Sequence, residues 1–163
     1  MLNIPIVLLY MKLISNYYKQ IFNFLHYLLF ALFAYASFSK LTDFDLFVNN
    51  LDKSPFFIGL NTALLAGLLI CSELIIMLFI FFEKTCRLGY FLSFLLFFLF
   101  TGYIFLILKF SPYIPCSCGG LIDKLSWVQH IYFNILFMLI SIFLFFWADK
   151  LQCDGATYNK ELA

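Results

Sequence analysis

The stretch from Leu88 to Phe110 reads LGYFLSFLLFFLFTGYIFLILKF and contains a single charged residue, Lys109. A helix crosses the hydrocarbon core of a bilayer with about 20 consecutive apolar residues, and this stretch reaches that length. Its apolar residues are continuous rather than alternating, which argues against a strand of a transmembrane barrel. Because only helices and closed barrels satisfy the backbone in lipid, the stretch is predicted to be a transmembrane helix.

Three further apolar runs of comparable length surround this one: Ile21–Ser39, Phe56–Phe82 and Trp127–Ala148. The chain has 163 residues, of which 64% are hydrophobic and 22% aromatic, and its mean hydropathy is +0.99. Charged residues make up 12%, about half the roughly 25% that is usual in soluble domains. A soluble domain of this size cannot bury so much apolar surface, which excludes a soluble enzyme and a disordered chain. We predict an all-α integral membrane protein that forms a four-helix transmembrane bundle.

The remaining segments are short. Residues 1–20 are predicted to be an N-terminal interfacial segment, residues 21–148 the four-span membrane domain, and residues 149–163 a polar C-terminal tail. The first run also allows a signal-peptide interpretation, with a cleavage site at Ala34–Ala36, but the three spans that follow favour an uncleaved helix. The net charge is +1 without any basic run, so the expected partner is the lipid bilayer and no nucleic acid is expected.

Four spans place both ends of the chain on one side of the membrane. The basic residues on that side are Lys12, Lys19, Lys84, Arg87, Lys150 and Lys160, and those on the other side are Lys40, Lys53, Lys109 and Lys124. By the positive-inside rule this difference favours cytoplasmic ends. We expect a multi-pass protein of the bacterial inner (plasma) membrane, with residues 40–55 and 111–126 in outward-facing, periplasmic loops.

The second outward loop contains the sequence PYIPCSCGG over residues 112–120, with Cys116 and Cys118 separated by one residue. A disulfide between such close neighbours fits the usual disulfide geometry poorly, and strain makes the bond more easily reduced. The prolines keep the approach extended, and the two glycines leave the sulfur atoms uncovered. The periplasm is an oxidising compartment, where disulfide chemistry is expected. These features indicate that Cys116 and Cys118 form a redox pair.

Two other interpretations of the pair remain. The two cysteines are either inert loop residues or two ligands of a metal site completed by His130 or by another chain. A site of four cysteines is excluded within one chain, because Cys86 and Cys153 lie across a membrane roughly 30 Å thick from the pair.

The fourth run opens with SWVQHIYFN over residues 126–134. His130 lies only about 5 Å deeper than Trp127 along a helix, close to the cysteine loop. His130 and Asn134 are four residues apart and therefore share a helix face, which is expected to turn inward. His130 is predicted to be a catalytic residue, either as the proton acceptor that helps to form a thiolate or as the hydrogen-bond donor to a bound electron acceptor such as a quinone. The alternative is that His130 and Asn134 only hold helices together, and Trp127 is interpreted as an interfacial anchor.

Two charged residues need an explanation: Glu73 lies inside a predicted span, and Lys40 directly follows one. Glu73 is the only acidic residue deep in a run; counted from Phe56 it lies roughly 25 Å along the helix, in the half away from the cysteine loop. This depth makes it a poor candidate for thiol chemistry. One interpretation gives it a structural partner such as His26, and the alternative is a role in proton conduction. Lys40 closes the first run, either as an end-cap that extends toward the interface or as a residue that favours a nearby thiolate. Residues 43–51 have the apolar spacing of a short helix on the membrane surface, and Ser54-Pro55 is the expected start of the second span.

The combination of these sequences resembles the MauE/DoxX family of redox-associated bacterial membrane proteins, over about residues 20 to 148. The segments that carry the resemblance are ASFSKLTDFD at 36–45, SPFF at 54–57, CSEL at 71–74, PCSCGG at 115–120, and the residues Trp127, His130 and Asn134. The resemblance implies a four-helix membrane bundle. It also implies a role in forming or supporting disulfides in exported proteins in the methylamine-utilisation branch, and a link to quinone-coupled sulfur oxidation in the DoxX branch. Cys116 and Cys118 would be the redox pair.

The sequence therefore favours a membrane thiol–disulfide component in which Cys116 and Cys118 exchange electrons with an exported thioredoxin-like partner or substrate. Arginine is absent from the outer side, so His130 or Lys40 would have to bind the oxygen of a quinone acceptor. The alternative is a non-enzymatic membrane assembly factor whose cysteines are structural or metal-binding. A small-solute carrier is disfavoured, because the spans contain few polar groups.

Overall fold

The computed structural model describes the backbone of residues 4–110 and 126–161, and the side chains of residues 15–54, 56–110 and 126–148. The elements in chain order are α1 (Ile4–Thr42), α2 (Phe44–Asp52), the short 3₁₀ helix η1 (Pro55–Phe57), α3 (Thr62–Phe81), α4 (Cys86–Phe110) and α5 (Trp127–Glu161). The all-α prediction is confirmed. Cys116 and Cys118 lie outside the described residues.

Four of these helices are long and apolar enough to cross a membrane, which confirms the predicted four spans. The candidate spans are Ser15–Thr42, Thr62–Phe81, Cys86–Phe110 and Trp127–Ala148. The fourth has the predicted bounds, and the third begins two residues before the predicted Leu88. The chain is therefore described as a multi-pass membrane protein.

The first and last helices are longer than the runs that predict them. Helix α1 begins at Ile4 and continues without a break through the segment expected to be separate at residues 1–20. Helix α5 likewise continues past Ala148 to Glu161. After Pro5, which lies in the first helical turn, neither stretch contains a proline, the residue that would interrupt a helix.

The second span starts later than expected. Pro55 begins a 3₁₀ turn, and Gly59 then adopts a φ of 84°, a left-handed conformation that glycine accepts without strain. The side chain of Asn61 accepts a hydrogen bond from the backbone N–H of Leu64 at 3.1 Å and caps α3. The prediction that Ser54-Pro55 opens the span is therefore wrong, and α3 begins at Thr62.

The expected surface helix is present as α2, and it packs against another helix of the bundle. Phe47 and Leu51 of α2 are buried against Ala66 and Ile70 of α3. Burial of this apolar face fixes α2 over the first turns of α3.

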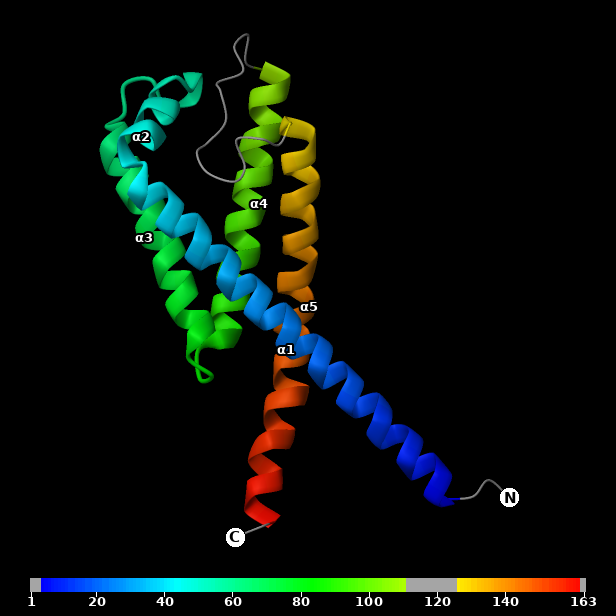
Figure 1. Ribbon diagram of the computed structural model, residues 1–163. Helices are drawn as coiled ribbons and strands as arrows, with labels where there is room; N and C mark the ends of the chain where they lie inside the picture. Colours follow the sequence, from blue (N-terminus) through cyan, green and yellow to red (C-terminus); the bar gives the residue numbers. More distant parts are fainter. Residues whose placement is uncertain (1–3, 111–125, 162–163) are drawn as a thin grey trace.

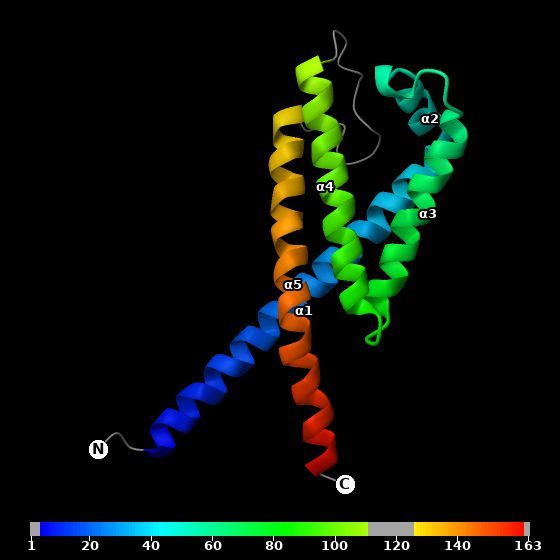
Figure 2. The same ribbon diagram turned by 180° about the vertical axis from the view of Figure 1, so that it is seen from behind.

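The bundle is narrow near the α3–α4 connection, where α1 crosses α5, and open toward α2; beyond the narrow end, α1 and α5 diverge (Figures 1 and 2). Helices α4 and α5 pack side by side along their length in both views, whereas α1 crosses α5 and then runs beside α3. The α3–α4 connection lies at the narrow end, on the side toward which α1 begins and α5 ends, and α2 lies at the opposite end. The described start and end of the chain thus lie toward the same end, as four spans require.

The main core lies where the helices converge. Leu29, Tyr90 and Leu144 are fully buried there, from α1, α4 and α5. The hydroxyl of Tyr90 is hydrogen-bonded to Nδ1 of His26 at 2.8 Å. His26 therefore pairs with Tyr90, and its predicted pairing with Glu73 is wrong.

Helices α3 and α4 approach each other closely at Gly89. A Cβ atom added at Gly89 would lie 2.8 Å from the backbone nitrogen of Ile80, whereas one added at Gly102 on the same helix would meet nothing within 4 Å. Glycine at position 89 is therefore required by contact with the backbone of a neighbouring helix.

We predict that Gly89→Ala lowers the stability of the folded bundle by about 1–3 kcal/mol, the usual effect of overpacking a core. Gly102→Ala is the matched control and should leave stability unchanged or slightly raised. Thermal unfolding of the two purified variants in one detergent measures the difference. Equal melting temperatures would contradict the close approach of α3 and α4.

Candidate functional site

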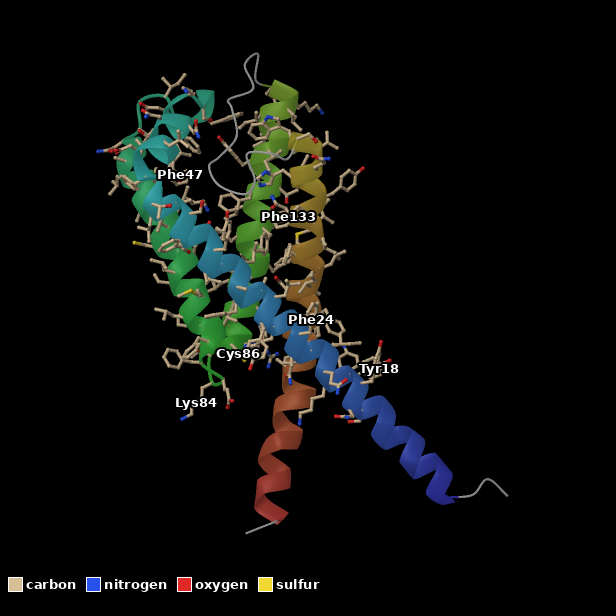
Figure 3. All side chains as sticks on the ribbon, in the orientation of Figure 1. Tyr18, Phe24, Phe47, Lys84, Cys86 and Phe133 are labelled. Atoms are coloured by element: carbon tan, nitrogen blue, oxygen red, sulfur yellow. The ribbon has the colours of Figure 1, made fainter. Side chains whose placement is uncertain are left out.

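A cavity of about 320 Å³ lies among the helices at the open end of the bundle. It is lined mainly by apolar side chains from α1, α2, η1, α3, α4 and α5. Phe47 of α2 and Phe133 of α5 are two of these wall residues, and Figure 3 shows them on the two sides of the bundle. The described polar residues in the wall are Lys40, Glu73, Tyr103, Trp127, His130 and Asn134. An apolar cavity with a few polar groups is the usual form of a small-molecule site.

Lys40 and Glu73 form a buried ion pair in the wall of this cavity. Nζ of Lys40 donates a hydrogen bond to Oε1 of Glu73, and the exposed fractions of the two side chains are 10% and 3%. The ammonium group also lies 5.6 Å from the ring centre of Phe47 and 5.9 Å from that of Phe100. Such cation–π contacts add to its stabilisation in an apolar site.

The ion pair corrects two interpretations of the sequence. Glu73 is less deep than expected, because α3 begins at Thr62 and Glu73 lies roughly 16 Å along it, near the middle of the helix. It shares the cavity wall with His130. Lys40 turns inward to Glu73 and is not an end-cap that reaches toward the interface.

The structure confirms that His130 and Asn134 share an inward-facing side of α5. Both line the cavity; His130 is half-buried, and Asn134 is only 2% exposed. Trp127 lies in the same wall, so it contributes to the cavity in addition to any role at the membrane interface.

Two buried polar atoms in the wall have no hydrogen-bond partner among the described residues. They are Oε2 of Glu73, an acceptor, and Nδ2 of Asn134, a donor. A buried polar group without a partner is costly, so nearly all such groups in folded proteins are paired with protein, water or ligand. Both atoms therefore mark positions where a bound molecule can supply the missing partner.

The start of α5 connects the cavity to the loop that carries the cysteines. The backbone N–H of Ser126 donates to the side chain of Gln129 at 2.8 Å, and the backbone N–H of Gln129 lies 3.3 Å from Oγ of Ser126. This reciprocal cap fixes the first turn of α5. The helix thus begins at Trp127, and Trp127 and His130 of its first turn both line the cavity.

The described cysteines lie away from the cavity. Cys71 is exposed on α3, whereas Cys86 is buried and donates to the carbonyl of Glu83 at 3.1 Å. In the described part of the chain, no three residues of the types histidine, cysteine, aspartate and glutamate are grouped to hold a metal ion.

Sequence reasoning missed two features of the site. Tyr103 lines the cavity, its hydroxyl donates to Oγ of Ser54 at 2.8 Å, and its ring stacks on Phe57 at 5.4 Å. No pattern in the sequence points to this tyrosine. The pairing of Lys40 with Glu73 had a detectable signal, because a lone acid inside an apolar run needs a cation within reach.

A family model matches the chain over residues 18–147, for the family described as "Methylamine utilisation protein MauE". The match covers more than half of the chain and includes all of the described cavity residues. No curated protein and no solved structure matches the chain.

We predict that Lys40→Met alone destabilises the protein by about 3–5 kcal/mol, because it leaves a buried carboxylate without its cation. The double variant Lys40→Met with Glu73→Gln should recover much of this loss, since neither charge then remains buried. The matched control is Lys53→Met, which removes an exposed lysine and should have little effect. Chemical or thermal unfolding in detergent measures these variants together with the wild type and the single variant Glu73→Gln, and additive losses in the double variant would contradict a coupled pair.

Proposed function

The chain belongs to the MauE family, and on this premise we propose that it is a membrane-embedded thiol–disulfide redox component. Cys116 and Cys118 would exchange electrons with an exported thioredoxin-like protein or substrate. The observation that carries the proposal is the position of His130. It lies in the first turn of α5, in the cavity wall, directly after the loop that contains the C-x-C pair.

The chemistry requires a thiolate and a resolving thiol. One cysteine attacks a sulfur of the partner's disulfide as a thiolate and forms a mixed disulfide, and the other cysteine then displaces the partner as a thiol. The reverse sequence oxidises a partner. When the pair reduces a partner, a proton leaves its attacking thiol, and His130 is the proposed acceptor because it is the first titratable side chain after the loop among the described residues.

Electrons that enter the pair need an acceptor in the membrane. Oxidation of two thiols to a disulfide releases two electrons and two protons, which a lipid-soluble quinone can take up together as it becomes a quinol. Lys40 is already paired with Glu73. Of the two residues expected to bind a quinone oxygen, His130 is therefore the better candidate.

We further propose that the protein resides in the bacterial inner membrane, with both ends in the cytoplasm and the cysteine loop in the periplasm. This orientation places the pair in the compartment where exported thiols are oxidised. It rests on the excess of basic residues on the side of the chain ends.

We predict that a Cys118→Ser variant, or its counterpart Cys116→Ser, accumulates a mixed disulfide with one exported protein, because the resolving thiol is missing. The complex should disappear on reduction and should be absent when both cysteines are replaced. Non-reducing gel electrophoresis of the full-length protein from its native membrane, followed by mass spectrometry, identifies the partner. A Cys71→Ser variant is the control for thiols outside the pair.

A different result would favour the alternative of a non-enzymatic assembly factor. In that case neither single variant traps a partner, and the purified protein retains zinc or copper with thiols that do not react. This outcome would contradict the redox proposal.

We also predict that a membrane-impermeant maleimide, added from the periplasmic side, labels Cys116 and Cys118 after reduction and not before. Replacement of His130 by leucine should slow this labelling at neutral pH by about tenfold or more, if the imidazole takes the thiol proton. Tyr132→Leu is the matched control, because Tyr132 is 70% exposed on the opposite face of α5. Labelling only from the cytoplasmic side would contradict the orientation, and equal rates in the two variants would contradict the role of His130.

A further inference from the structure

The cavity at the open end of the bundle is large enough for a ring compound. Its volume is about 320 Å³, whereas an engineered apolar cavity of about 150 Å³ already holds a benzene ring. Phe33, Phe97 and Phe133 are among the aromatic side chains that line it. A substituted or fused ring therefore fits by size and by the chemistry of the walls.

The two unpartnered atoms define the polar groups that such a ring must carry. Glu73 and Asn134 are each 2% exposed, and both side chains line the cavity. Oε1 of Glu73 is taken by Lys40, so Oε2 is left to accept a hydrogen bond from a ligand. Nδ2 of Asn134 is left to donate one.

Water alone is a poor occupant of this space. A buried water makes two to four hydrogen bonds, and apolar cavities remain dry. The cavity offers few polar atoms spread over walls that are mostly aromatic and aliphatic. An apolar body with one hydroxyl donor and one oxygen acceptor satisfies both the walls and the two atoms.

We propose that this cavity binds the head group of a lipid-soluble quinol, which donates a hydroxyl to Oε2 of Glu73 and accepts a hydrogen bond from Nδ2 of Asn134. The proposal rests on the function proposed above, and it assigns the electron acceptor to Glu73 and Asn134 in place of His130, which keeps the role of proton acceptor. The oxidised quinone has carbonyl oxygens and no hydroxyl, so it can satisfy Asn134 but not Glu73. The site therefore binds the reduced form more tightly than the oxidised form.

This preference fits the balance of the redox step. The two thiols of Cys116 and Cys118 lose two electrons and two protons and form a disulfide, and the quinone gains both electrons and both protons and becomes a quinol. Tighter binding of the quinol makes the bound quinone a stronger oxidant, because ligand binding and reduction are linked equilibria. The unpartnered oxygen of Glu73 would thus favour electron flow from the thiols to the quinone.

The test is a titration of the full-length protein with both cysteines of the pair replaced by serine, so that neither ligand form can react with them. Decylubiquinol and menadiol are titrated separately by calorimetry in detergent without oxygen, and then the corresponding quinones. We expect saturable binding of at least one quinol, with weaker binding of its quinone. Tighter binding of decylubiquinol would identify a benzoquinol as the ligand class, and tighter binding of menadiol a naphthoquinol. Both results support the proposal.

Two pairs of variants locate the binding site. Ala36→Phe fills the cavity from α1 and should weaken quinol binding by tenfold or more, whereas Ala31→Phe on the exposed side of the same helix should not. Asn134→Leu should weaken binding about tenfold, the effect of one buried hydrogen bond. Ser141→Ala is its control on the same helix, because the Ser141 hydroxyl donates to the carbonyl of Phe137.

Glu73→Gln should weaken binding of the quinol and leave that of the quinone nearly unchanged. Ala36→Phe and Asn134→Leu leave the ion pair intact, so they test the site even if Glu73→Gln fails to fold. Absence of saturable binding, or equal affinity in Ala36→Phe and Ala31→Phe, would overturn the proposal. A trapped mixed disulfide without quinol binding would overturn this site alone, whereas quinol binding without a trapped partner would support the site and contradict the thiol function.

Discussion

An ion pair between Lys40 and Glu73 is the constraint on which the open end of the bundle depends. A carboxylate inside a membrane span is tolerated only when it is protonated or paired, and here its partner is a lysine from a different helix. The lysine ammonium also lies over Phe47 of α2 and Phe100 of α4. A single charged group therefore contacts α2, α3 and α4 from its position on α1. Without it, the cavity would lose the group that ties these helices together around it.

The two ends of the bundle satisfy their polar groups in different ways. At the narrow end, His26 and Tyr90 are paired with each other. Buried serines such as Ser93 and Ser141 donate to carbonyls four residues earlier on their own helices. At the open end, a carboxylate oxygen and an amide nitrogen remain without partners among the described residues. The narrow end is thus a completed packing core, whereas the open end has the features of a site that a ligand completes.

The sequence predicted the spans well because long apolar runs in lipid admit few structures. It also predicted that His130 and Asn134 share an inward face, since residues four apart in a helix always do. The start of α3 was missed because Gly59 and Asn61 form a turn and a cap within an apolar stretch, where the hydrophobic pattern does not change. That error of a few residues placed Glu73 too deep and gave it the wrong partner. The sequence also could not show which way the Lys40 side chain points, because a long side chain at a helix end reaches the interface or the interior equally well.

Helix α5 orders the site from the loop inward. The helix carries one stripe of residues along the cavity wall, formed by Trp127, His130 and Asn134. These residues are three and then four positions apart, so they share a helix face. The imidazole belongs to the first turn of α5, and the unpartnered amide lies about 6 Å deeper along the helix. Ser141, the next polar residue on that stripe, is satisfied by its own helix and lies outside the cavity wall. Within the cavity wall, the polar stripe therefore ends at Asn134. Proton exchange with the loop at one level and binding of a head group at a deeper level are the two tasks that this spacing separates.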